Sequence, residues 1–317
     1  MRITAYWLMV GTILCITGCA FVNVPLMPET KPLEETVIEG TGRSKVLIIA
    51  IEGVITTERR RLFAGIDNEP DTVARVKEEI EKAKSDKKIK ALILKINSPG
   101  GTVTACDIIH KEILEFKKAT GLPVIACLMD TAASGGYYIA SAADTIIAHP
   151  TTITGSIGVI ATKFNVQGLM QKLGIAEESI KSGDKKDILS PFRSMTPEEQ
   201  RLMQDIINTL YQKFLDTIIA GRKALNREEL IPLADGRVFT ASQACDAKLV
   251  DSVGYMADAI TAAKERAGIA EARVVVYHRP ATYKNNIYSQ AHITFFGLTE
   301  QEFSAYQPVR FMYLWNP

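Results

Sequence analysis

Short, largely aliphatic runs most constrain the fold of this 317-residue chain. Residues 46–51 (VLIIAI), 91–96 (ALILKI) and 122–128 (LPVIACL) are each of strand length. A strand that is apolar at successive positions has both faces buried, as in a parallel sheet covered by helices. The runs therefore predict an α/β fold with a parallel sheet and right-handed βαβ crossovers.

Segments with helical periodicity alternate with these runs. Residues 70–84 gather their apolar side chains on one helical face and keep charges elsewhere. A longer helix is predicted from Thr196, because Thr196 and Glu199 have the spacing of a capping box and Pro197 suits the first helical position. The remaining predictions are helices over 102–118, 133–143 and 256–267, and short strands over 145–148 and 274–277.

The N-terminal 28 residues have the pattern of an export signal. Arg2 precedes the apolar segment 3–16, and residues 16–19 (ITGC) place two small residues before Cys19. This resembles a bacterial lipobox, which implies a signal peptide over 1–18 and a lipid on Cys19, and Ala20 favours the outer membrane. An uncleaved anchor over 3–27, in the inner membrane, is the alternative. Either anchor makes 19–44 a tether and places the following chain in the periplasm.

Composition excludes some partners. The formal net charge of +1 argues against general affinity for nucleic acid. The cysteines that remain after Cys19 lie in largely apolar runs, so we expect free buried thiols at Cys106, Cys127 and Cys245. No cysteine or histidine spacing indicates a metal site, and no cofactor is expected.

Two glycine-rich segments follow predicted strands, where α/β proteins place their sites. Residues 97–101 (NSPGG) could present backbone N–H groups to an oxyanion, or could be a plain turn. In residues 130–138 (DTAASGGYY), Ser134 is either an accessible nucleophile or a helix N-cap. The double glycine after Ser134 favours the nucleophile, because glycine destabilises a helix.

Taken in order, the motifs of this chain resemble the signal peptide peptidase A family. The matching segments are 98–101 (SPGG), 132–138 (AASGGYY), 154–159 (TGSIGV), 183–187 (GDKKD), 236–240 (GRVFT) and 249–254 (LVDSVG). Members of that family are serine peptidases of the ClpP/crotonase superfamily with a Ser-Lys dyad. The resemblance covers residues 45–267, and we place the peptidase domain at 45–277.

The resemblance implies a role for each matching residue. Ser134 would be the nucleophile, Lys186 the general base, and Gly101 and Gly135 the oxyanion hole. Ser156 would orient the lysine amine. Lys185 and Lys181 are alternative bases. A lysine can act as a base at neutral pH only where burial disfavours its charge.

A Ser-His-Asp triad is the competing catalytic arrangement. The histidines are His110, His149, His278 and His292, and a structural or surface role suits each of them better.

The chain has the length of single-length family members, in which neighbouring subunits supply Ser and Lys. The resemblance therefore implies a homo-oligomer with shared active sites. The aromatic tail over 278–317 is expected to dock on a neighbouring subunit or on its own core, with membrane contact as the alternative.

Three functions remain open at this point. The first is a membrane-anchored serine endopeptidase that cleaves exposed apolar segments of peptides, such as remnant signal peptides or envelope proteins. The others are an inactive lipoprotein scaffold and a crotonase-type acyl-CoA enzyme.

Overall fold

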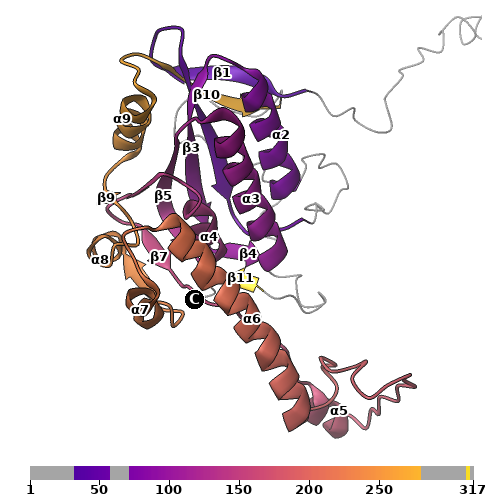
Figure 1. The fold of residues 1–317 in the computed structure, drawn as a ribbon. Coiled ribbons are helices and arrows are strands. Elements are labelled where there is room, and N and C mark those ends of the chain that lie inside the picture. Colours follow the sequence, from indigo (N-terminus) through magenta and orange to yellow (C-terminus); the bar gives the residue numbers. More distant parts are fainter. Residues whose placement is uncertain (1–31, 58–70, 280–311, 315–317) are drawn as a thin grey trace, which may run out of the picture. The chain divides into compact units, whose positions relative to one another are not determined.

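A mostly parallel sheet organises the chain (Figure 1). The structure is a computed structural model that describes residues 32–57, 71–279 and 312–314. The strands are β1 (Glu34–Glu39), β2 (Lys45–Glu52), β3 (Ile89–Ser98), β4 (Gly100–Thr102), β5 (Val124–Ala133), β6 (Thr145–Ala148), β7 (Ile153–Gly155), β8 (Val238–Thr240), β9 (Ser252–Val253), β10 (Arg273–His278) and β11 (Met312–Leu314). The helices are α2 (Thr72–Ser85), α3 (Val103–Thr120), α4 (Gly135–Ala140), α5 (Gln167–Lys172), α6 (Pro197–Gly221), α7 (Arg227–Leu230), α8 (Ala241–Asp246) and α9 (Met256–Ala267), with a 3-10 turn at Ile231–Leu233.

The central strands pair in parallel, as the aliphatic runs predict. Within the described residues, the sheet has the order β1-β10-β2-β3-β5-β6-β9, with β7 beside β5 and β8 beside β7. The pairs β2–β3, β3–β5 and β5–β6 are all parallel. The order and the helical connections confirm the α/β, ClpP/crotonase-like fold class.

Both faces of the sheet are buried, which explains why its strands are apolar at successive positions. Leu47 and Ile49 point into the core that contains the apolar side chains of α2 and α3. Val46 and Ile48 point to the opposite face, where they pack with α9. Figure 1 shows α2 and α3 on one side of the sheet and α9 on the other.

The predicted helices form within two residues of their expected ends, with one exception. Thr196 accepts from the Glu199 N–H, and Glu199 accepts from the Thr196 N–H, so the capping box of α6 is confirmed. The exception is the helix expected over 133–143. Ala133 still belongs to β5, and α4 spans only Gly135–Ala140 because the chain turns sharply at Ser134.

Two strands lie in segments where the sequence predicts a tether and a tail. Residues 34–39 of the expected tether form β1, which pairs antiparallel with β10 at the edge of the sheet. Residues 312–314 of the expected tail form β11, which pairs antiparallel with β4. The tether prediction is therefore wrong for 34–39, and 312–314 dock on the body of their own chain.

The N-terminal predictions lie outside the described residues, Cys19 and the segment 3–27 among them. Of the helices that the structure does describe, none combines the length and apolarity needed to cross a bilayer. Cys106 and Cys127 are buried free thiols as expected, whereas Cys245 is free but only partly buried.

Candidate active site

Ser134 occupies a strained turn between β5 and α4. Its backbone has φ 51° and ψ −113°, a region that costs a residue with a side chain about 1–3 kcal/mol. The turn is held by a hydrogen bond from the Ser134 N–H to the Gly155 carbonyl oxygen at 2.7 Å. Ser134 stands at the N-cap position, but its hydroxyl does not cap the helix. The capping explanation for this serine is therefore wrong.

The double glycine after Ser134 is required by close packing. A Cβ on Gly135 would lie 2.4 Å from the Cys106 sulfur, and a Cβ on Gly136 would lie 2.8 Å from the Ser98 carbonyl oxygen. Both distances are well below van der Waals contact. The two glycines let α4 approach the segment that follows β3.

That neighbouring segment, residues 98–101, is tightly ordered. The Ser98 hydroxyl donates to the Gly53 carbonyl oxygen at 2.6 Å and accepts from the Gly100 N–H at 3.0 Å. A Cβ on Gly135 would lie 3.1 Å from the Gly101 nitrogen, so the backbones of these two glycines are adjacent. The carboxyl ends of the adjacent parallel strands β3 and β5 thus bring Gly101, Ser134 and Gly135 together.

Ser156 lies beside this turn. Gly155 pairs with Ala133 at the end of β7, so Ser156 directly follows the residue that binds the Ser134 N–H. Ser156 also has a positive φ, 48°, and its N–H donates to the Arg237 carbonyl oxygen at 2.7 Å. Within the described part of the chain, neither the Ser134 nor the Ser156 hydroxyl has a hydrogen-bond partner, which leaves both available to a lysine amine.

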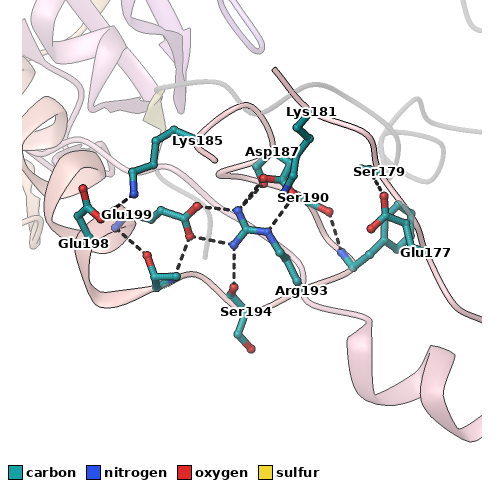
Figure 2. A network of polar contacts seen from close by, with 12 residues as sticks. Glu177, Ser179, Lys181, Lys185, Asp187, Ser190, Arg193, Ser194, Glu198 and Glu199 are labelled. Atoms are coloured by element: carbon teal, nitrogen blue, oxygen red, sulfur yellow. Dashed lines mark hydrogen bonds and ion pairs between the residues drawn. The ribbon is translucent and has the colours of Figure 1, made fainter. Parts of the chain in front are cut away.

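The three candidate lysines differ in their contacts, and Figure 2 shows two of them, Lys181 and Lys185. Lys181 forms an ion pair with Asp187, and Lys185 forms one with Glu198, each at 2.7 Å. Lys186 is exposed and, among the described residues, has no ion pair or side-chain hydrogen bond. It is therefore the lysine of the three whose amine is uncommitted.

Arg193 fixes the segment around Lys186. Its guanidinium donates two hydrogen bonds to the Asp187 carboxylate, at 2.8 and 2.9 Å. It donates two more to Glu199, at 2.6 and 2.9 Å (Figure 2). Such bidentate, charge-assisted bonds favour ionised carboxylates. Arg193 and then Lys181 hold the pKa of Asp187 well below its usual range, and Arg193 with the Thr196 N–H lowers the pKa of Glu199 to about 2.

The single chain does not bring Lys186 to Ser134. Lys185 and Asp187, on either side of Lys186, are held at the first turn of α6. Phe214 lies sixteen residues after Glu198, the α6 residue that binds Lys185. The ring of Phe214 packs against Tyr138 in α4. At 1.5 Å per residue, these two points on α6 are about 24 Å apart.

The described histidines lie against other groups. His110 packs edge-on against Tyr138, and burial lowers its pKa to about 4. His149 pairs with the Thr151 hydroxyl, and His278 with the Thr36 hydroxyl. None of these three rings hydrogen-bonds Ser134, and His292 lies outside the described residues.

Sequence reasoning missed two parts of this region. In the sequence, Arg193 is one of many charged residues in a polar loop. Only the structure shows that it binds both Asp187 and Glu199, which lie six residues away on either side. The position of Tyr313 beside Gly101 depends on pairing between segments two hundred residues apart, for which no local pattern exists.

Comparison with known proteins indicates the family of this chain. The model of peptidase family S49 matches residues 116–270, and the Clp protease model matches residues 49–155. A signal peptide peptidase SppA of Enterococcus faecium, so named, is 35% identical over 250 residues, which cover 78% of this chain and 71% of that protein.

Further similarities extend to longer proteins and to solved structures. Protease 4 of Salmonella typhi is 35% identical over 204 residues, which cover 64% of this chain and 32% of that protein, so the chain spans about a third of it. Among solved structures, a ClpP1 variant from Listeria monocytogenes is 18% identical with a TM-score of 0.44, covering 67% of this chain and 94% of that one. From the identity and coverage of the SppA match, together with the S49 match across the segment that contains Ser134, Ser156 and Lys186, we conclude that the chain belongs to peptidase family S49.

Proposed function

We propose that this chain is a serine endopeptidase that hydrolyses exposed apolar segments of peptides or proteins through Ser134 and Lys186. The observation that carries the proposal is the strained turn at Ser134, whose hydroxyl is uncommitted and which adjoins the backbone of Gly101 and Gly135. Strain of this kind persists where the surrounding structure enforces it, and it is typical of active sites.

The proposed reaction is acyl transfer to water. The Ser134 oxygen attacks the carbonyl carbon of the substrate peptide bond while the neutral Lys186 amine takes the hydroxyl proton. The N–H groups of Gly101 and Gly135 stabilise the oxyanion. The C–N bond then breaks, and the leaving amine takes the proton from Lys186. Water, deprotonated by the same lysine, hydrolyses the ester and restores Ser134.

The lysine in this reaction would come from a neighbouring subunit. Lys186 is exposed in the single chain and about 24 Å along α6 from the Ser134 region, so it needs both a partner serine and burial. The segment that carries it also exposes large apolar side chains, which soluble proteins seldom leave uncovered in a group. They are Phe164, Leu169, Leu173, Ile175 and Ile180.

Two single substitutions test the catalytic roles. Ser134→Ala and Lys186→Ala should each abolish hydrolysis of an unfolded apolar substrate such as reduced casein, whereas Lys185→Ala should keep it. A fluorophosphonate probe should label Ser134 in the wild type, as read by intact mass and peptide mapping. Full hydrolysis in Ser134→Ala would overturn the proposal, and loss in Lys185→Ala alone would assign the base to Lys185.

A mixing experiment tests whether the sites are shared. Neither inactive variant has a complete site, but a mixed assembly can place a Ser134 from one subunit beside a Lys186 from another. Random mixing of Ser134→Ala and Lys186→Ala subunits should then restore about a quarter of the wild-type activity. No recovery, in mixtures shown by mass spectrometry to have exchanged subunits, would mean that each site uses a single chain.

We also propose that the protein is a lipid-anchored envelope protein that faces the periplasm. The support is the ITGC segment that ends at Cys19. Radioactive palmitate should label the wild type, and Cys19→Ser should lose the label. Label retained in Cys19→Ser would refute lipidation at this residue, and a wild type that takes up no label would favour the inner-membrane anchor.

A further inference from the structure

A cavity of about 420 Å³ lies at the opposite end of α4 from Ser134. Its wall contains residues 141–144, which follow α4, and residues 220–224 around the end of α6. The wall also includes residues of α3 and α9, and Asp251 before β9. The structure describes every residue assigned to the candidate active site, and none of them lines this cavity. The cavity is therefore separate from that site.

Cationic side chains outnumber carboxylates in the wall of the cavity. The cations are Lys117, Arg222, Lys223 and Arg266, and the carboxylates are Asp144 and Asp251. His110 also lines the cavity, but its ring is neutral at pH 7 because burial lowers its pKa to about 4. Positive charge is therefore in excess, which favours an anionic ligand.

Both carboxylates of the wall are already paired. Lys117 forms an ion pair with Asp144 at 2.8 Å, and Arg222 donates two hydrogen bonds to Asp251 at 2.8 and 2.9 Å. The Lys117 ammonium also donates to the Ala142 carbonyl oxygen at 2.9 Å. This contact offsets part of the negative potential that the carbonyl groups at the end of α4 bring to the cavity.

Lys223 and Arg266 carry the excess positive charge. Lys223 follows the end of α6, whereas Arg266 lies on α9, so two separate elements direct a cation to one cavity. Both residues are exposed, and in the part of the chain that the structure describes neither side chain has an ion pair or a hydrogen bond. Two uncommitted cations match an anion that carries two negative charges.

Arg222 is the buried cation of the wall. Its side chain is 6% exposed, and besides the two bonds to Asp251 it donates two to the Lys248 carbonyl oxygen, at 3.0 and 3.2 Å. A guanidinium has five N–H donors, so one N–H of Nη1 has no acceptor among the described residues. A buried, charged donor without an acceptor destabilises the fold, and an anion in the cavity supplies that acceptor.

The cavity also has an apolar part. Leu114 is 43% exposed, and four alanines contribute methyl groups to the wall, Ala142, Ala143, Ala220 and Ala224. A volume of about 420 Å³ is in the range of pockets that hold small organic ligands. A ligand that fills the cavity therefore combines an anionic group with an organic part.

We infer that this cavity binds a small organic phosphate. Lys223, Arg266 and the remaining N–H of Arg222 contact the phosphoryl oxygens, whose geometry and charge suit guanidinium groups. The organic part packs on Leu114. A free phosphate ester and the headgroup of an anionic lipid share this chemistry, and their affinities distinguish the two sources. This binding site is independent of the proposed peptidase activity.

Isothermal titration calorimetry on the full wild-type chain tests the site with butyl phosphate, which at pH 8 carries a dianionic phosphoryl group and a short apolar chain. Lys223→Gln and Arg266→Gln should each weaken its binding at least tenfold, because each removes a charge-assisted contact. Lys264→Gln is the matched control, since Lys264 lies on α9 as Arg266 does but does not line the cavity. No binding to the wild type, or equal affinity in all three variants, would overturn the inference.

Two further ligands test the organic part. Inorganic phosphate should bind the wild type several-fold more weakly than butyl phosphate, because it leaves the apolar part of the cavity empty. If the two bind equally well, the organic part of the inference is wrong. Dihexanoyl phosphatidic acid, used below its micelle concentration, represents the lipid headgroup. Tighter binding than butyl phosphate would identify a lipid as the source of the ligand, and weaker binding would identify a free ester.

Thermal unfolding separates binding at this cavity from a general effect of salt. A ligand that binds only the folded chain raises Tm, so butyl phosphate should raise it relative to sodium chloride at the same ionic strength. The rise should shrink in Lys223→Gln and Arg266→Gln and persist in Lys264→Gln. An equal rise in all three variants would overturn the site. Neither measurement depends on hydrolysis, so a negative result would leave the proposed peptidase function untouched.

Discussion

The Ser134 N–H donates to the Gly155 carbonyl oxygen at 2.7 Å, which ties the candidate nucleophile to the residue before Ser156. Gly155 has φ 88°, and a Cβ there would lie 2.5 Å from the Phe239 ring. Strand β8, which carries Phe239, therefore helps to set the position of the Ser134 turn through β7.

Gly155→Ala should reduce peptidase activity about a hundredfold, because a displacement of about 1 Å at a catalytic group has an effect of that size. The measurement is kcat/KM on casein-derived peptides. Gly158→Ala is the matched control, since its Cβ would meet its nearest neighbour at an ordinary 3.7 Å. Equal losses in both variants would contradict the role of Gly155.

Ser134→Gly should stabilise the fold relative to Ser134→Ala. Glycine adopts φ 51° and ψ −113° without the steric strain that serine and alanine share. Glycine also has more conformational entropy in the unfolded chain, which offsets part of this gain. The free energy of unfolding of Ser134→Gly should therefore exceed that of Ser134→Ala by about 1 kcal/mol. Urea unfolding of the two inactive variants measures it, and a Ser134→Ala protein at least as stable as Ser134→Gly would contradict strain at this turn.

Arg193→Lys should lower peptidase activity about tenfold, because lysine cannot reproduce the fork that holds Asp187 and Glu199 together. The same variant should also be cleaved faster between residues 181 and 195 by thermolysin. This protease does not cut at lysine or arginine, so the substitution itself does not change its cleavage sites. Arg227→Lys, which alters an exposed ion pair with Asp216, is the control and should leave both measurements unchanged. The prediction fails if the two variants behave alike.

Acid should destabilise the protein through His110. Burial lowers the pKa of His110 to about 4. Attraction to the Asp107 carboxylate partly offsets this shift, and repulsion from Lys213 and Lys117 adds to it. Between pH 6.5 and 4 the unfolded chain therefore binds a proton that the folded chain does not. The free energy of unfolding should fall by about 3 kcal/mol over this range because of this residue.

His110→Asn removes the titrating ring and should show a correspondingly smaller fall between pH 7 and pH 4. Guanidinium unfolding at a series of pH values measures the free energy of unfolding of both proteins. Because both contain the same carboxylates, the difference between their pH dependences reports on His110. Identical pH dependence would exclude His110 as the source.

Local patterns in the sequence are enough for the central parallel strands and for most of the helices. The strands β2, β3 and β5 are apolar on both faces, and burial of those faces requires helices on either side. The capping box at Thr196 likewise depends on residues only three apart. The short strands β4, β7, β8 and β9 have two or three residues each, too few to show a period, so they were not predicted.

The candidate site itself was decided by tertiary structure. The serine and the glycines could be chosen from their motifs, but whether Ser134 caps α4 or stands free depends on a turn enforced from β7. The motif favours Lys186 as the base, and the structure separates it from the alternatives Lys181 and Lys185 through the ion pairs that engage those two lysines. Tyr313 reaches Gly101 through pairing between distant segments. Motifs record residue types and spacing along the chain, whereas strain, ion pairing and the pairing of distant strands arise from atoms that folding alone brings into contact.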